Sequence, residues 1–321
     1  RKRQTVRAHV QITPYDLARE LVADLGLTVE AAAVGPIWQR LIQHRQNDLE
    51  LLVSLAERCG LYLTLRENTL HLLTLEGVGD VTPLILGESL YEARVDVNAD
   101  PAVRSVAAVG WNPLRVETHT AQVSSPRVGR SVSAEAPPAR VGVNGTRDLV
   151  NEITQDDTHA EAFAQAELDV RVAREVVLTG TAEGNPRLQP GAPVEVFNMM
   201  PQINGRYVLT AVTHQLSKHT GFVSEFSTTP PPRSTPPRSP TAALGVVTQI
   251  DDPENVGRVR VALPAYSNVE TGWMSTVSVG AGAGKGLMAQ PDVDDLVLVL
   301  FTDDDPGQGV IIGSLYGVNG P

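Results

Sequence analysis

The C-terminal part of the chain has the hydrophobic pattern of a small β-barrel. Residues 258–263, RVRVAL, place valine or leucine at every second position, which is typical of a strand with one buried face. Residues 296–301, LVLVLF, are apolar at every position, and so are residues 310–312, VII. Because a barrel has only one interior, the apolar side chains on its outer face need cover from another surface.

A second copy of the chain is the simplest cover for these strands, so the pattern predicts an oligomer held together by this region. The pattern leaves open which alternate set of side chains points outward. The predicted intersubunit residues are therefore Leu296, Val297, Leu298, Val299, Leu300, Phe301, Val310, Ile311 and Ile312.

Three helices are predicted before residue 228. The first follows Thr13, a good N-cap with proline behind it, and ends at Gly26. The second begins at Asn47 and ends at Gly60, with leucines at helical spacing between them. The third covers about residues 157–175, where an acidic start suits the helix dipole.

The remaining segments read as strands, loops and one spacer. A hairpin is predicted over residues 61–75, and further strands over residues 84–125. Residues 126–150 are rich in Pro, Ser, Arg and Gly, which predicts a surface loop. The run TTPPPRSTPPRSPT, residues 228–241, has six prolines in fourteen residues and predicts an extended linker. The fold class is therefore mainly β with a few helices.

Motifs in the C-terminal segment resemble the OB-fold domain of the VgrG and phage baseplate-spike family, the central spike of contractile injection machines. That family pattern joins an Asp-Asp-Pro turn, a Gly-Arg-Val strand, a Trp-bearing strand, a Gly-Lys-Gly turn, two acidic turns and a closing Ile-Gly-Ser-Leu-Tyr. The matching positions are Asp252-Pro253, Gly257–Val261, Trp273, Gly284–Gly286, Pro291–Asp294, Asp305-Pro306 and Ile312–Tyr316.

Three runs in the earlier part resemble the hub domain of the same family, also described as late control D or baseplate hub-like. They are QNDLELLVSLAERCGLYLTLRENTLHLL, GNPRLQPGAPVEVF and INGRYVLTAVTHQL. The resemblance implies a hub-like domain over 1–227 with a loop excursion at 126–150, a Pro-rich linker over 228–243, an OB-fold spike domain over 244–317, and the start of a needle or tail at 318–321. Compared with the family, the chain is expected to be truncated before a first β-barrel and before a C-terminal β-helix needle.

The resemblance also implies a structural role without enzymatic activity. The expected assembly is a homotrimer that caps the tail tube and transmits puncturing force. Tail tube and baseplate proteins are expected on the hub side, and a PAAR-like tip protein or effector cargo on the needle side. The target membrane is contacted only on firing. One alternative is a spike that bears a peptidoglycan hydrolase or effector domain outside this chain.

The machine served by such a spike stays open between three kinds. Of the 26 basic residues only three are lysine, which indicates a GC-rich bacterial genome. An extracellular phage-tail-like particle assembled in the bacterial cytoplasm ranks first on this hint. A type VI secretion apparatus ranks second, and a phage virion third.

Charge and motif content argue against other chemistry. The net charge is −11, and residues 241–321 hold ten acidic against three basic residues, whereas an OB-fold that binds nucleic acid needs a basic groove with stacking aromatics. The run 280–286, GAGAGKG, lacks the spacing and the hydroxyl of a phosphate-binding loop. The acidic runs at 292–295 and 303–305 lack calcium-loop spacing, and no catalytic motif occurs. We therefore expect no metal, no cofactor and no nucleic acid.

The single cysteine, Cys59, lies on the apolar side of the second predicted helix. It has no partner in the chain for a disulfide, and a buried structural thiol is expected there. No apolar run approaches the roughly 18 residues of a membrane span.

Overall fold

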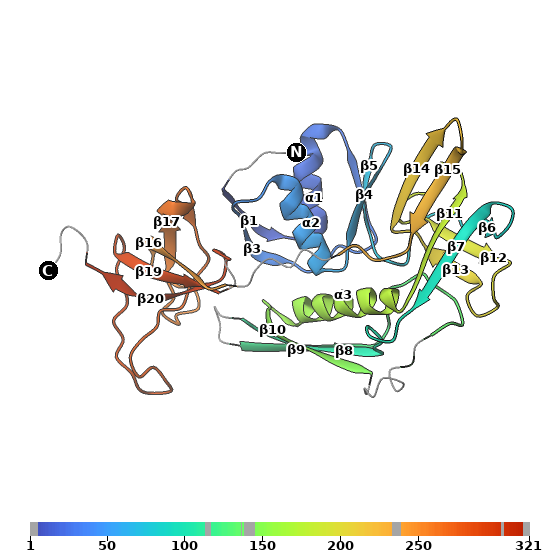
Figure 1. The fold of residues 1–321 in the computed structure, drawn as a ribbon. Helices are drawn as coiled ribbons and strands as arrows, with labels where there is room; N and C mark the ends of the chain where they lie inside the picture. Colours follow the sequence, from blue (N-terminus) through green and yellow to red (C-terminus); the bar gives the residue numbers. More distant parts are fainter. Residues whose placement is uncertain are drawn as a thin grey trace.

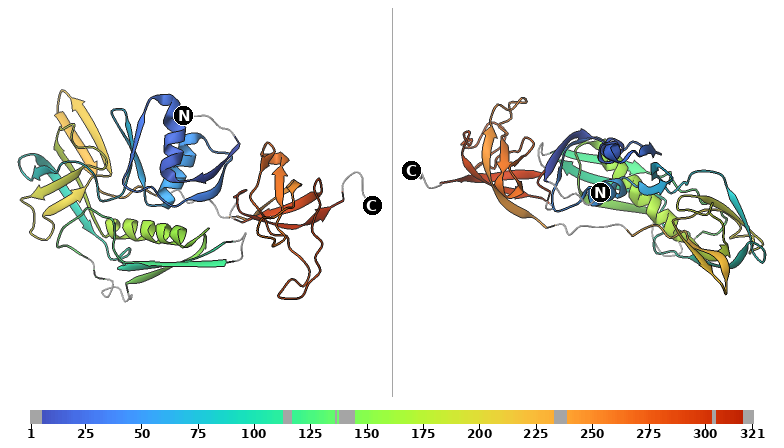
Figure 2. Two further views of the ribbon diagram at one scale, coloured as in Figure 1. Left: turned by 180° about the vertical axis from the view of Figure 1, so that it is seen from behind. Right: turned by 90° about the horizontal axis from the view of Figure 1, so that it is seen from above.

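The computed structural model describes residues 6–112, 117–135, 137, 145–232, 239–302 and 305–316. Among these residues the fold is mainly β with three α-helices, as the pattern predicts. Figures 1 and 2 show an elongated molecule in which a small barrel stands at one end, beside the C-terminus. The larger part, up to residue 232, forms three packed units.

The first unit contains two of the three predicted helices. Helix α1 (Pro14–Val22) is capped by the Thr13 side chain and continues into the short 3-10 helix η1 (Ala23–Leu25). Helix α2 (Asp48–Arg58) begins with a capping box, in which Asn47 and Glu50 satisfy each other's backbone N–H groups. Both helix starts are confirmed, and Gly26, directly after η1, and Gly60, two residues after α2, have positive φ. The helices pack on two small sheets, formed by β1 (Arg7–Ile12) with β3 (Trp38–Gln43), and by β2 (Thr28–Ala31), β5 (Thr69–Leu73) and β4 (Tyr62–Arg66).

The second unit is one long helix on a three-stranded sheet. Helix α3 (Asp157–Glu175) spans the predicted range and lies along one face of the sheet in Figure 1. Its small side chains, such as Ala160 and Ala164, let it approach β8 closely, where Val106 and Ala108 are buried beneath it. The sheet has the order β10 (Thr146–Ile153), β8 (Ser105–Asn112), β9 (Glu117–Val123).

The third unit is a pair of packed sheets around a shared apolar core. The four-stranded sheet has the order β14-β15-β11-β7, and the three-stranded sheet the order β13-β12-β6. Fully buried Leu178, Val194 and Tyr207 belong to the core between them. The strands are β6 (Thr82–Ile85), β7 (Leu90–Val97), β11 (Val176–Glu183), β12 (Pro193–Phe197), β13 (Gly205–Val208), β14 (Ala211–Ser217) and β15 (Gly221–Ser227).

The predicted surface loop at 126–150 is wrong at its end, where a strand begins, and two of its other residues bond to distant backbone. Strand β10 begins at Thr146 and pairs in parallel with β8. Farther upstream the backbone of Gly129 donates to Leu75, and Ser131 exchanges two hydrogen bonds with Arg206. Residues 136 and 138–144 lie outside the described residues. Turn-forming composition reports local preference only, whereas these partners are distant in sequence and become available only on folding.

The ends of the predicted linker are part of the flanking structure. The Leu178 amide donates to the Thr228 hydroxyl at 2.9 Å, so the linker's first residue is tied to β11. Strand β16 already begins at Thr241. Residues 233–238 and the expected needle start at 318–321 lie outside the described residues.

The C-terminal barrel is a five-stranded sheet whose two ends are joined by an irregular segment. The strand order is β18-β17-β16-β19-β20. Met274 exchanges two backbone hydrogen bonds with Val259, and the next residues, Ser275 and Val277, both bond to Ile311 of β20. Residues 274–277 thus close the sheet around its core. The strands are β16 (Thr241–Gln249), β17 (Arg260–Leu263), β18 (Val269–Glu270), β19 (Leu296–Phe301) and β20 (Gly309–Leu315), with the short 3-10 helix η3 (Pro264–Tyr266) between β17 and β18.

Candidate assembly surface

Four of the nine predicted intersubunit residues lie in the barrel core and not on its outer surface. Val297, Val299, Phe301 and Ile311 are fully buried and pack with Met274 and other members of the barrel core. These four residues hold the barrel itself together. The structure thereby decides between the two sets that the sequence pattern left open.

The other five predicted residues face outward and are joined there by neighbours from β16 and β20. Leu244 pairs with Leu298 across β16 and β19, and Leu300 pairs with Val310 across β19 and β20. Leu244 is 48% exposed and Ile312 is 42% exposed. We call this surface the outer strip; its residues are Ala242, Leu244, Val246, Leu296, Leu298, Leu300, Val310, Ile312 and Leu315.

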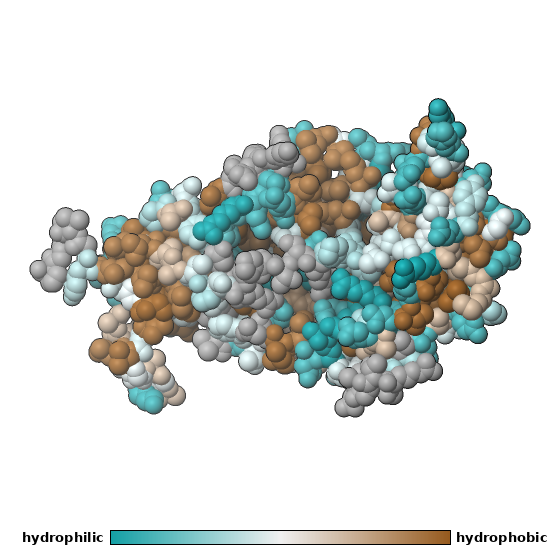
Figure 3. Space-filling view, in the orientation of Figure 1, coloured by the Kyte–Doolittle hydropathy of each residue, from teal (hydrophilic) through white to brown (hydrophobic). Residues whose placement is uncertain are grey.

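The outer strip contains no charged or polar side chain over three adjacent strands. Figure 3 shows hydrophobic residues gathered over this end of the molecule. Single exposed apolar side chains are common on soluble proteins, but contiguous apolar patches are not. Such a patch therefore marks an interaction site. The strip is therefore the candidate assembly surface of the barrel.

A different outward face of the barrel is charged and contacts the larger part of the chain. Arg40 of β3 donates from Nε to the Glu270 carbonyl oxygen at 2.9 Å. The Glu270 carboxylate accepts from the Thr248 hydroxyl at 2.9 Å and lies 3.3 Å from the Arg260 guanidinium. Burial lowers the pKa of Arg40, and the nearby charge of Arg260 lowers it further. We call this contact the joint; it orients the barrel on β3 without using the outer strip.

The acidic turn before β17 holds a buried ion pair between residues of two of the sequence motifs. Asp252 is buried and accepts two hydrogen bonds from the Arg258 guanidinium, at 2.7 and 3.1 Å. It also accepts from the backbone N–H groups of Glu254, Val256 and Arg258. These contacts, the guanidinium above all, hold the pKa of Asp252 well below its usual range and raise that of Arg258.

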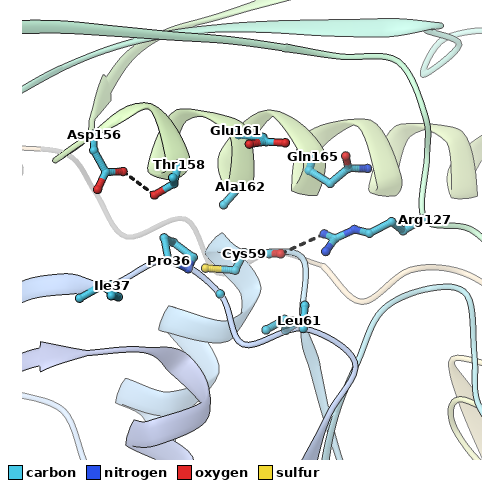
Figure 4. A pocket seen from close by; sticks show the side chains of 12 residues that line it. Pro36, Ile37, Cys59, Leu61, Arg127, Asp156, Thr158, Glu161, Ala162 and Gln165 are labelled. Carbon is cyan, nitrogen blue, oxygen red and sulfur yellow. Dashed lines mark hydrogen bonds between the residues drawn. The ribbon is translucent and has the colours of Figure 1, made fainter.

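A pocket of about 630 Å³ lies between α3 and the segment around residues 33–37 (Figure 4). Arg127 donates to the Cys59 carbonyl oxygen at 3.1 Å on one wall, and the Asp156 carboxylate caps α3 on another. Burial raises the pKa of the Cys59 thiol to about 12, so this cysteine is protonated and inert at neutral pH. The predicted buried structural thiol is confirmed.

The remaining sequence candidates form turns in the structure. Gly282 and Lys285 exchange backbone hydrogen bonds, so the 280–286 run is the end of a hairpin that no helix follows. Asp295 accepts from the Asp292 amide at 2.9 Å and closes its own turn. In the described ranges no group of three or more His, Cys, Asp or Glu could hold a metal ion; residues 303 and 304 lie outside them. Among the described helices, none combines the length and apolar character that crossing a bilayer requires.

Comparison with known families covers almost the whole chain. Residues 3–218 match the family model described as the Alg8 N-terminal domain. Residues 243–316 match the one described as the type VI secretion system/phage-baseplate injector OB domain. The first match ends in the turn between β14 and β15, and the second covers the barrel.

A similar curated protein is the actin cross-linking toxin VgrG1 of Vibrio cholerae, 27% identical over 190 residues. The match takes in 50% of this chain but only 17% of the toxin. Among solved structures, the E. coli c3393 protein, described as a component of the type VI secretion system, matches 98% of this chain and 74% of its own at 12% identity, with a TM-score of 0.60. The 43 kDa tail protein of prophage MuSo2 from Shewanella oneidensis matches 68% of this chain and 65% of its own at 17% identity, with a TM-score of 0.50. These structures establish the fold.

Proposed function

Because the chain belongs to the family of the Alg8 N-terminal domain, and with its injector OB domain to the VgrG and phage baseplate hub-spike family, we propose that it is a structural hub and spike subunit. In this role it caps the tail tube of a contractile injection system as a homotrimer and transmits puncturing force. The observation that carries the proposal is the outer strip. A barrel that exposes nine adjacent apolar positions needs a partner surface, and a closed ring of identical chains supplies one.

The energetics favour assembly through this strip. Burying apolar surface contributes roughly 25 cal/mol per Å², so covering the exposed half of one leucine or isoleucine contributes about 1 kcal/mol. Three copies of the strip in one ring would bury many such side chains. The joint supports the same role, because force applied along the barrel passes to β3 through Arg40 and Glu270.

The expected partners follow from the role. Tail tube and baseplate proteins would contact the hub-like part, and a tip protein or effector cargo would attach beyond the barrel. We place the assembled protein in an extracellular phage-tail-like particle, with a type VI apparatus or a virion as alternatives. The genes beside this one separate the three: capsid genes indicate a phage, and a membrane-anchored core complex indicates type VI secretion.

A spike that carries an enzyme or toxin is the second candidate. The relative from Vibrio cholerae is named as an actin cross-linking toxin, and the matched part is a small share of its length. Any such activity would reside in residues beyond those that the two proteins share. Sequencing the complete reading frame tests this candidate directly.

The oligomeric state tests the proposed structural role. Light scattering coupled to size-exclusion chromatography at micromolar concentration should give three times the 34.4 kDa mass of the chain. A stable monomer under these conditions would contradict the proposal.

A further inference from the structure

A second apolar surface on the barrel takes no part in its core. Between the closing segment and β19 the chain forms a projection that Figures 1 and 2 show standing away from the barrel. Val279 is 80% exposed, Leu287 67% and Met288 72%. We call residues 277–288 the arm.

The arm is an ordered hairpin rather than a loose loop. Gly282 and Lys285 exchange backbone hydrogen bonds at 3.2 Å, and the Leu287 amide donates to Val279 at 3.0 Å. At Gly286 the backbone has φ of +122°, and a Cβ there would lie 3.0 Å from the Ala281 Cα, so this position requires glycine. Backbone bonding therefore fixes the shape, and the aliphatic side chains are left without cover.

A ring of three identical chains needs two different surfaces on each chain. In a cyclic trimer every interface is heterologous, so one patch of each copy contacts another patch of the next. The barrel displays two apolar surfaces outside its core, the outer strip and the arm. Both belong to one small domain, so each copy of the barrel can present one of them to each of its two neighbours.

The connections and charges of the two surfaces fit this pairing. The arm begins directly after Thr276, which bridges Ile311, and Ile311 lies between strip residues Val310 and Ile312. The arm of each copy therefore starts at the edge of that copy's own outer strip and extends away from it. Lys285, at the end of the hairpin, is the one charged residue in the arm, and the strip has none. Docking the aliphatic part of the arm on the strip buries no unpaired charge.

We propose that the arm packs across the outer strip of the neighbouring copy, with Leu287 and Met288 covering Leu244, Leu298 and Ile312. This inference rests on the proposed trimer and names the two surfaces that close it. The arm then acts as a clasp between barrels, and the joint remains free to hold each barrel on its own hub.

Cross-linking between isotopically distinct copies tests the pairing. A photoreactive amino acid replaces Leu287 in the full chain, and equal amounts of ¹⁴N- and ¹⁵N-labelled protein are mixed, reassembled and irradiated. Mass spectrometry should find mixed-label cross-links from the arm to peptides containing residues 241–249 or 296–315. A matched probe at Leu216, which is 83% exposed on β14, should not reach these peptides. A trimer whose arm cross-links only to its own chain, or to other regions, would overturn the pairing while the trimer itself stands.

A pair of substitutions in the arm gives an independent readout. Leu287→Ser with Met288→Ser should raise the concentration at which the trimer dissociates by at least about tenfold, because two large side chains lose their apolar contact. At concentrations where both proteins are dissociated, thermal unfolding of the barrel should be the same, since neither residue belongs to its core. An unaltered dissociation concentration would refute the clasp alone, whereas a monomeric parent protein would refute the clasp and the proposed function together.

Discussion

Arg258 and Asp252 form a buried, two-point ion pair at the base of the first barrel turn, with donor–acceptor distances of 2.7 and 3.1 Å. The six-residue separation lets the chain turn through Pro253 and return with Arg258 beside the carboxylate. The same carboxylate binds three backbone N–H groups, so one side chain organises the whole turn. The Asp-Asp-Pro motif supplies the carboxylate and the Gly-Arg-Val motif supplies the guanidinium, so the two motifs together stabilise one turn.

Removing the negative charge of this pair should destabilise the barrel. Asp252→Asn leaves the buried Arg258 with only the half-exposed Glu254 as a counter-charge, which costs up to about 3–5 kcal/mol. Hydrogen exchange of the β17 amides, measured by mass spectrometry on the full chain, should show this loss in opening free energy. Glu254→Gln is the matched control, because Glu254 also lies 3.3 Å from Arg258 but is half exposed, and it should change the value by less than about 1 kcal/mol.

The same pair predicts how the barrel responds to acid. The folded pKa of Asp252 lies below its unfolded value of about 3.9. A depressed carboxyl pKa contributes stability that is complete above the unfolded value and is lost as the pH falls toward the folded value. Opening of β17 should therefore increase below about pH 4 in the parent protein. The Asp252→Asn variant should lack this component, and identical acid profiles would contradict the assignment.

The two faces of β19 should respond differently to charge. Val297→Asp with Val299→Asp places carboxylates in the barrel core and should unfold it, because each unpaired buried charge costs several kcal/mol. Leu298→Asp with Leu300→Asp places them on the outer strip and should leave a folded monomer. Circular dichroism and light scattering separate the two outcomes. Trimers formed by the second variant would exclude the strip as the interface.

The joint between the hub and the barrel can be measured by a double-mutant cycle. Arg40→Ala and Glu270→Ala each remove one partner, and the double variant removes both. We expect a coupling energy of about 0.5–1 kcal/mol, because the pair is partly buried. Opening of the β18 amides is a suitable readout. Strictly additive effects would show that Arg40 does not recognise the Glu270 side chain.

The segment before β10 should prove essential for α3. Asp169 is fully buried and accepts from the Arg127 amide at 2.7 Å and its guanidinium at 2.9 Å. Arg127→Ala removes the counter-charge and should destabilise this unit by about 3–5 kcal/mol in hydrogen exchange of α3. Arg171→Ala breaks a partly buried helix pair with Glu167, which keeps Arg147 as a second partner, and should cost less than about 1 kcal/mol. Equal effects of the two substitutions would contradict the assignment.

The sequence by itself determined the elements whose causes are local. Thr13, Asn47 and Asp156 cap the three helices at the predicted places, because a capping side chain binds backbone groups only two or three residues away. The β17 strand was predictable for the same reason, since alternation along one strand records which face is buried.

Only the tertiary structure decided which side chains of β19 form the candidate assembly surface. All six residues of that strand are apolar, so the pattern does not show which side chains face the barrel core and which face outward. Pairing with β16 and β20 sets the register, and a shift of one residue would exchange the core set with the outer strip. For a related reason the sequence did not predict two contacts: the joint between Arg40 and Glu270, and the ion pair between Arg127 and Asp169. Their partners are 230 and 42 residues apart, and they meet only when packing of the separate units brings them together.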